Sequence, residues 1–229
     1  MRPAGLLGAL GLLLGLAGVW LTVVDHRTAP AVVVAGAGLL AVGMAGWEGG
    51  PNGAKEVALV AAVGAVAAAG RVLFAAIPNV QPVTTMTACA GVALGPRAGA
   101  AVGALAAILS NGFLGQGPWT PWQMLAWGLV GTGGGLLGPA LRRRSALVAY
   151  CFACGFAFDA LLNVSELATF GPTWSWAAFW ALEVRGLGFD TAHAVGNALL
   201  ALVAGPALIR LLDRYGRRLR VDIEWLSGA

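Results

Sequence analysis

The stretch that decides the fold runs from Ile77 to Trp127 and reads IPNVQPVTTMTACAGVALGPRAGAAVGALAAILSNGFLGQGPWTPWQMLAW. It is apolar enough for a membrane interior, yet polar segments interrupt it at 78–82 and at 111–118. A bilayer offers no water to exposed backbone groups, so irregular backbone at that depth must be buried in protein or line a cavity. We therefore expect the two breaks to border a binding site for a polar ligand.

Composition places the chain among integral membrane proteins. Of its 229 residues, 59% are hydrophobic and only 10% are charged, and the mean hydropathy is +0.80. The sequence contains no GxxxxGK[ST] phosphate-binding loop, and its only lysine is Lys55. Any ATP-driven step is therefore expected on another polypeptide.

Hydrophobic segments of about 17 to 25 residues are long enough to cross a bilayer as helices. Applied to this sequence, that length criterion predicts an all-α polytopic membrane protein with eight helices. We expect two extra N-terminal transmembrane helices in 1–50, a six-helix core in 51–215 and a cytoplasmic tail in 216–229. The predicted segments are Ala4 to Val24, Pro30 to Trp47, Lys55 to Ile77, Val83 to Leu94, Gly99 to Phe113, Trp119 to Leu141, Ala146 to Ala168 and Phe189 to Leu212.

Positive charge predicts the orientation of these helices. Arg142, Arg143 and Arg144 lie together in one short loop, and an arginine-rich tail begins at Arg210. Short basic loops resist translocation, so both regions are expected in the cytoplasm. Both termini are then cytoplasmic, and both breaks of the deciding stretch face outside.

The segment from Val83 to Leu94 is too short to cross the membrane alone. As a helix it reaches about 18 Å, whereas the hydrocarbon core is about 30 Å thick. Interrupted hydrophobic segments of this kind are good sequence indicators of a transporter's binding site. The segment from Trp174 to Val184 is also short, and we expect it to lie along the outer surface.

Tryptophans gather near the predicted outer boundary. They form either an interfacial belt or an aromatic wall over a flat ligand, and the sequence leaves both readings open. The residues concerned are Trp119, Trp122, Trp174, Trp176 and Trp180.

Arg71 lies inside a predicted span, about two turns before the first break. A charge at the bilayer centre costs about 2.5 to 3.5 kcal/mol on insertion scales, so it is expected to be paired or functional. Arg71 either pairs with Asp159 or Asp190, or it remains free to meet an anionic or amide-bearing ligand.

Two later helices carry polar residues at spacings of three and four, which places them on one face of each helix. These are Asp159, Asn163 and Glu166 on the first helix, and Asp190, His193 and Asn197 on the second. Together with the breaks, they give a predicted substrate-binding set of Arg71, Asn79, Gln81, Asn111, Gln116, Trp119, Trp122, Gln123, Asp159, Asn163, Asp190, His193 and Asn197.

Neither a metal site nor a cofactor is expected. His26 is the only histidine besides His193, and no HExxH motif occurs. Cys151 and Cys154 form a CxxC inside an apolar helix, where cysteine behaves as a small hydrophobe, and we interpret them and Cys89 as packing residues.

Small residues recur every three or four positions along the helix from Lys55 to Ile77. Such faces let helices approach closely in lipid, either within one protein or between subunits. The alanine face of this helix contains Ala58, Ala62, Ala65 and Ala69.

From Lys55 to Gly131, and again at Phe189 to Asn197 (FDTAHAVGN), the chain resembles the substrate-binding S components of energy-coupling factor (ECF) vitamin transporters. The resemblance implies a six-helix bundle that captures a vitamin under two outer loops, here 78–82 and 111–118. It also implies a transmembrane coupling (T) subunit, docked on the alanine face, and two ATPases. The two N-terminal helices depart from the six-helix pattern.

Three functions remain open at this point. The favoured one is vitamin capture. Among S components the chain looks most similar to those for cobalamin or related corrinoids, and its amides suit an amide-ringed ligand, while riboflavin or another vitamin is also possible. The second is an intramembrane enzyme that uses Asp159, Glu166, Asp190 and His193. The third is a structural membrane protein without a ligand.

Overall fold

The computed structural model describes residues 54–170 and 174–219, together with residues 13 and 17. The two predicted N-terminal helices and the end of the tail lie outside these residues. The described part is all-helical, and the chain is an all-α polytopic membrane protein. Three of its helices, α3 (Ala54–Leu73), α5 (Pro96–Leu114) and α8 (Arg144–Phe170), are long and apolar enough to cross a membrane.

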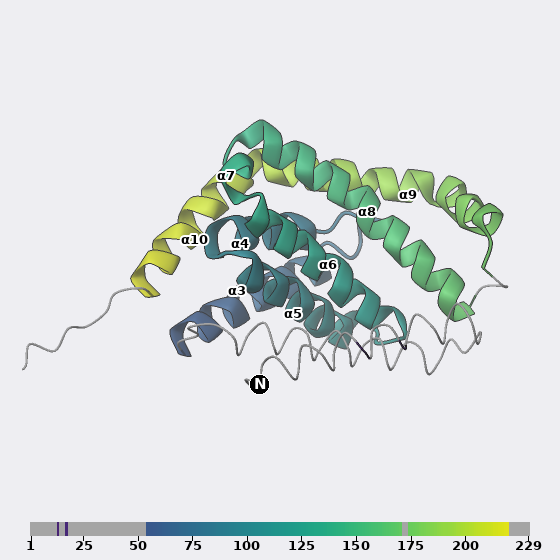
Figure 1. The fold of residues 1–229 in the computed structure, drawn as a ribbon, viewed down its shortest axis with the longest axis horizontal. Coiled ribbons are helices and arrows are strands. Elements are labelled where there is room, and N and C mark those ends of the chain that lie inside the picture. Colours follow the sequence, from purple (N-terminus) through teal and green to yellow (C-terminus); the bar gives the residue numbers. More distant parts are fainter. Residues whose placement is uncertain (1–12, 14–16, 18–53, 171–173, 220–229) are drawn as a thin grey trace, which may run out of the picture.

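Five further helices complete the described fold. They are α4 (Val83–Leu94), α6 (Trp119–Leu136), α7 (Gly138–Leu141), α9 (Trp176–Val203) and α10 (Gly205–Leu219). In Figure 1, α8 and α9 lie together along one side and α3 and α5 lie on the other, with α4 and α6 between them. The short α4 is therefore enclosed by longer helices, as its length requires.

Close packing of α5 against α6 depends on glycine. A Cβ added to Gly131 would collide with the backbone of Gly99, and one added to Gly103 would collide with the backbone of Trp127. Small residues at a helix interface let the two backbones approach closely. This approach brings the end of α5 beside the beginning of α6, where the second break lies.

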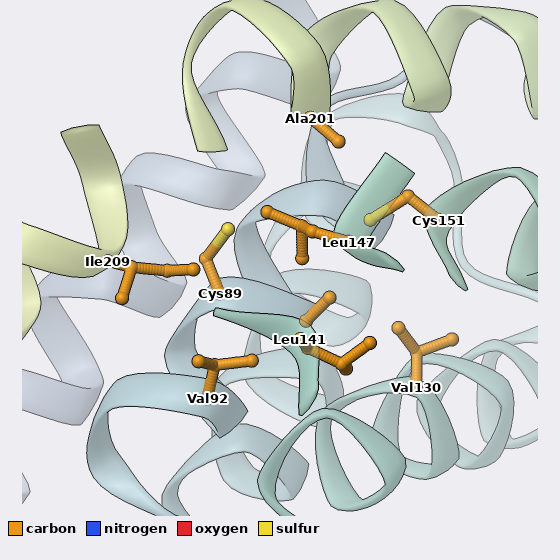
Figure 2. Close-up of a cluster of buried hydrophobic side chains, with 9 residues drawn as sticks. Cys89, Val92, Val130, Leu141, Leu147, Cys151, Ala201 and Ile209 are labelled. Atoms are coloured by element: carbon orange, nitrogen blue, oxygen red, sulfur yellow. The ribbon is translucent and has the colours of Figure 1, made fainter. Parts of the chain in front are cut away.

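A buried apolar cluster holds the opposite end of the bundle together. Helices α4, α6, α8, α9 and α10 all contribute to it, and Figure 2 shows Cys89 and Cys151 among its aliphatic side chains. Both thiols are free and buried, while Cys154 packs against the cluster from its edge. The prediction that the cysteines are packing residues is confirmed.

The last predicted span, Phe189 to Leu212, is wrong. A continuous helix, α9, begins at Trp176, where Ser175 Oγ accepts a hydrogen bond from the Ala178 amide at 3.1 Å. It ends at Val203, and α10 leaves at a bend of 62°. Pro206 lacks an amide hydrogen and clashes with the preceding turn, which explains the break.

The predicted segment from Trp174 to Val184 is not a separate element. It was expected to be one because it is too short to span a membrane, whereas α9 runs without interruption from Trp176 to Val203. Its position along the outer surface stays a prediction. The other predicted boundaries differ by a few residues. Helix α3 stops at Leu73, and Leu137 separates α6 from α7, which begins with Gly138 and Pro139.

Candidate functional site

Both breaks of the deciding stretch lie at the same end of the bundle. The first connects α3 to α4 and the second connects α5 to α6, so antiparallel helices bring them together. Arg97, in the first turn of α5, and the arginines at 142–144, where α7 gives way to α8, lie at the other end. The polar breaks and the basic loops are thus separated by the length of the helices.

Arg71 is the centre of the polar network at this end. Its Nε donates to Gln81 Oε1 at 2.7 Å, and its Nη1 donates to Ser110 Oγ at 2.7 Å and to Asn111 Oδ1. The guanidinium also lies over the indole of Trp127, 5.0 Å from the ring centroid, which is a cation–π contact. The cation is held by neutral groups from two helices, α5 and α6, and from the loop between α3 and α4.

The expected pairing of Arg71 with Asp159 or Asp190 does not occur among the described residues. Asp159 instead accepts hydrogen bonds from Asn79 and faces His193. The Nη2 group of Arg71 makes no hydrogen bond within the described part of the chain, and it is not among the fully buried atoms that lack a partner. Two N–H donors therefore remain available to a ligand.

Asn111 links Arg71 to the second break. Its amide nitrogen donates to Thr120 Oγ1 at 2.8 Å and to Gln123 Oε1 at 2.7 Å, both on the first turns of α6. Thr120 in turn donates to Gln116 Oε1 at 2.9 Å, inside the loop itself. The ends of α5 and α6 are thereby joined by side chains that can both donate and accept.

Asn79 links Arg71 to the later helices. Its side-chain oxygen accepts from Gln81 Nε2 at 2.9 Å, while its nitrogen donates to Asp159 and to the backbone oxygen of Phe189. Asn79 has φ of 53°, and it is the one non-glycine residue with positive φ in the described segments. This left-handed conformation is unfavourable for most side chains, so the amide contacts hold the loop in place.

A buried chain of hydrogen bonds runs beneath Asn79. Trp127 Nε1 lies 3.0 Å from Thr84 Oγ1, Thr84 Oγ1 lies 3.2 Å from His193 Nε2, and His193 Nδ1 lies 3.0 Å from Asp159 Oδ2. The indole can only donate, so the Thr84 hydroxyl accepts from it. The hydroxyl also contacts His193 Nε2, and the other ring nitrogen, Nδ1, faces the Asp159 carboxylate.

Most of the predicted substrate-binding residues meet in this one network. Asn197 joins it from below, since it accepts from Thr85 and donates to the backbone oxygen of His193. Eight of the other predicted residues take part directly, namely Arg71, Asn79, Gln81, Asn111, Gln116, Gln123, Asp159 and His193.

The remaining predicted residues lie around the network. Asn163 donates to Glu183 Oε1 at 2.8 Å and so joins α8 to α9. Asp190 is buried one turn before His193, Trp122 is half-buried, and Trp119 is 37% exposed at the start of α6. The indole of Trp119 packs against Gly117, where an added Cβ would collide with the ring.

The tryptophans at the start of α9 contact one another. Trp174 lies 5.7 Å from Trp176 and 6.0 Å from Phe179, and Phe179 lies 5.3 Å from Trp180, between ring centroids. The rings of Trp176 and Trp180 are more than half exposed. This arrangement favours the interfacial belt over the ligand wall for this group.

Several hydroxyl and indole groups of the network were not predicted. A signal for the hydroxyls was present, because Thr84 and Thr85 are polar within a short apolar helix, and Ser110 adjoins Asn111. Thr120 lies three residues before Gln123, on the same helix face. The unpredicted members are Thr84, Thr85, Ser110, Thr120 and Trp127.

Comparison with known proteins places this geometry in a family. The model of the family described as ECF-type riboflavin transporter, S component, matches residues 52–180, which is more than half of the chain. The chain belongs to this family. The comparisons with curated proteins and with solved structures found no significant match.

Family membership fixes the general function of this S component. It is a membrane-embedded substrate-binding subunit of an ECF transporter, which is a transport component and not an enzyme, and it works with T and ATPase modules. The match covers both breaks and ends within the first helical turns of α9. The matched region does not include Asp190, His193 and Asn197. Their assignment to the site therefore rests on the structure.

Proposed function

We propose that this S component binds riboflavin at the network centred on Arg71, under the loops at 74–82 and 115–118. The matched family carries that vitamin in its description. The ligand's ring has an imide edge, in which one N–H lies between two carbonyl groups, and its side chain carries hydroxyls. Amide side chains that donate and accept at the same time, as Gln81 and Asn111 do, are suited to both parts.

The observation that carries this proposal is the hydrogen bonding of the Arg71 guanidinium. Its bonded partners in the network are neutral, and Nη2 offers donors to ring carbonyls. A guanidinium nitrogen with two N–H groups can donate to the carbonyl oxygens of a planar ring. A flat ligand with ring carbonyls fits this arrangement.

The corrinoid preferred from the amide-rich sequence receives no support from the family match, which names riboflavin. The amides that suggested a corrinoid do not distinguish it from riboflavin, because they are bonded within the protein. Asn111, for example, has its oxygen on Arg71 and its nitrogen on Thr120 and Gln123. We therefore favour riboflavin, which the amide pattern had left open.

Transport is proposed to follow the arrangement that the resemblance implies. The network faces outside and both termini face the cytoplasm, according to the basic loops. A T subunit docks on α3, and two ATPases drive the delivery inward. The predicted docking residues support this assignment, because all four side chains are exposed on one stripe of α3; they are Ala58, Ala62, Ala65 and Ala69.

The test is a binding titration of the purified full chain in detergent with riboflavin, flavin mononucleotide, cobalamin and thiamine, measured by calorimetry and by flavin fluorescence. Riboflavin is expected to bind most tightly. Arg71→Gln should weaken it at least tenfold, because a hydrogen bond to a charged group contributes about 1.5 to 3 kcal/mol.

Arg185→Gln is the matched control, since Arg185 is an exposed arginine of α9. It should leave the affinity for riboflavin unchanged. Tight binding of cobalamin without binding of riboflavin would overturn the assignment of the ligand. Equal losses in the Arg71 and Arg185 variants would overturn the assignment of the site.

A further inference from the structure

A groove lies on the surface between α8 and α9, near the arginines at 142–144. Its volume is about 670 Å³, and its walls are almost entirely apolar. The lining residues are Arg144, Ser145, Val148, Ala149, Phe152, Ala198 and Leu202. Figure 1 shows the two helices lying side by side along this edge of the bundle, away from α3 and α5.

The groove follows the helix axes. Its α8 residues recur at intervals of three and four, so they form one face of that helix, and Ala198 and Leu202 do the same on α9. From Arg144 to Phe152 the face extends about 12 Å along the axis. An apolar channel of this direction and length suits part of an extended hydrocarbon chain.

Positive charge lies at one end of this groove. Arg142 is engaged by Asp213, with N–O distances of 2.7 and 2.9 Å. Arg143 and Arg144 are exposed, and neither side chain forms a hydrogen bond or ion pair within the described segments. Arg144 therefore places an uncompensated charge at the end of the apolar walls, and Arg143 is the residue next to it in the chain.

The first turn of α8 adds to this positive end. The helix begins at Arg144, so the backbone N–H groups of its first residues have no acceptor within the helix. Such groups, together with the helix dipole, favour a negative group nearby. The groove is thus apolar along its length and doubly basic at its mouth.

We propose that this groove binds an anionic phospholipid, with an acyl chain between α8 and α9 and the phosphate at Arg143, Arg144 and the first turn of α8. Basic pockets between transmembrane helices are the usual sites for anionic headgroups. A zwitterionic lipid would place its own cation beside two arginines and would therefore bind less tightly. This lipid site is separate from the network at Arg71, which lies at the other end of the helices.

The experiment measures lipid binding to the purified full chain, by native mass spectrometry from a neutral detergent, with phosphatidylglycerol and phosphatidylcholine compared at equal concentration. Phosphatidylglycerol is expected to bind preferentially. The Arg143→Gln/Arg144→Gln variant should lose about 25-fold in affinity for it, taking about fivefold for each arginine. Arg214→Gln/Arg217→Gln removes the same charge from α10 and should retain full binding.

A second pair of variants tests the apolar part. Ala198→Trp fills the groove and should prevent binding of phosphatidylglycerol, whereas Leu199→Trp adds the same ring to an exposed position of α9 outside the groove and should not. Thermal unfolding and riboflavin binding are measured for every variant to show that the fold is intact.

Equal binding of the two lipids, or equal losses in the two arginine pairs, would overturn the proposal. Loss of binding in the arginine variant but not in Ala198→Trp would also contradict it, because the groove would then play no part. Loss of phosphatidylglycerol together with unchanged riboflavin binding separates this site from the vitamin site.

Discussion

The side-chain amide of Asn79 donates to both carboxylate oxygens of Asp159, at 3.2 and 3.1 Å, across 80 residues of sequence. One partner lies in the loop that covers the proposed vitamin site, and the other lies in the middle of α8. The loop is therefore fastened to a helix that the first break does not adjoin.

Asn79→Ala should both destabilise the protein and weaken riboflavin binding. It removes donors from a buried carboxylate, at a cost of about 1 to 3 kcal/mol, and it places alanine at a φ of 53°, at a further cost of about 1 kcal/mol. Asn79→Gly loses the same hydrogen bonds but tolerates the backbone. The unfolding temperature in detergent should therefore be lowest for alanine, intermediate for glycine and highest for the parent; equal values for the two variants would exclude the backbone contribution.

Thr84→Val should be more destabilising than Thr84→Ser. Valine keeps the shape but leaves the Trp127 N–H and His193 Nε2 without their buried partner, at about 1 to 3 kcal/mol for each group. Serine keeps the hydroxyl and loses one buried methyl, which costs about 1 kcal/mol. Thermal unfolding of both variants measures the difference, and a valine variant as stable as the serine one would show that the chain of hydrogen bonds contributes nothing.

Ala62→Trp and Ala65→Trp should abolish uptake and leave riboflavin binding intact. Both side chains are exposed on the α3 stripe, where a large ring prevents close approach of another helix. Uptake in cells that express the T and ATPase partners is compared with binding to the purified chain. Val195→Trp, at an exposed position of α9, is the control and should transport normally; normal uptake by the two α3 variants would refute the docking face.

Asp213→Asn should lower the free energy of unfolding slightly, by an amount that depends on pH. The hydrogen bond from Arg142, followed by its charge, holds the pKa of the Asp213 carboxyl below its ordinary value of 3.8. The carboxylate therefore stabilises the fold fully above that value, and the contribution falls as pH drops toward the lower folded pKa. Both side chains are partly exposed, so we expect about 0.5 to 1 kcal/mol at pH 7.

The measurement for Asp213 is the unfolding temperature of parent and variant at pH 7, 5 and 3.5. The difference in unfolding temperature between parent and variant should persist from pH 7 to pH 5 and become smaller at pH 3.5. A gap that widens as the pH falls would contradict the assigned sign.

Much of the site could be predicted from sequence because membrane insertion makes polar residues conspicuous. Asn79, Asn111 and Asp159 stand out against an apolar background, and the short α4 requires an irregular connection beside it. Less conspicuous residues were missed. Thr84 and Ser110 carry hydroxyls that can bond within their own helix, so their role in the network was not evident from type or spacing.

Helix ends were predicted less well than helix existence. Hydropathy is an average over a window, and it does not register the 62° bend at Ala204 or the continuity of α9 through Glu183 and Arg185. Local chemistry decides such points: Pro206 ends one helix, and the Ser175 cap begins another.

The sequence by itself determined that this is an all-helical membrane protein with two polar breaks, because the bilayer constrains hydrophobic length and backbone hydrogen bonding. Only the tertiary structure determined which polar side chains contact one another. From the sequence, Arg71 could either pair with a carboxylate or remain available to a ligand. Packing of α3 against α5 places it in hydrogen-bonding contact with Ser110 and Asn111, whereas Asp159 contacts Asn79 and His193. Hydrogen bonds between residues tens of positions apart depend on how helices dock, and that is set by contacts such as those of Gly99 and Gly131, which no local pattern encodes.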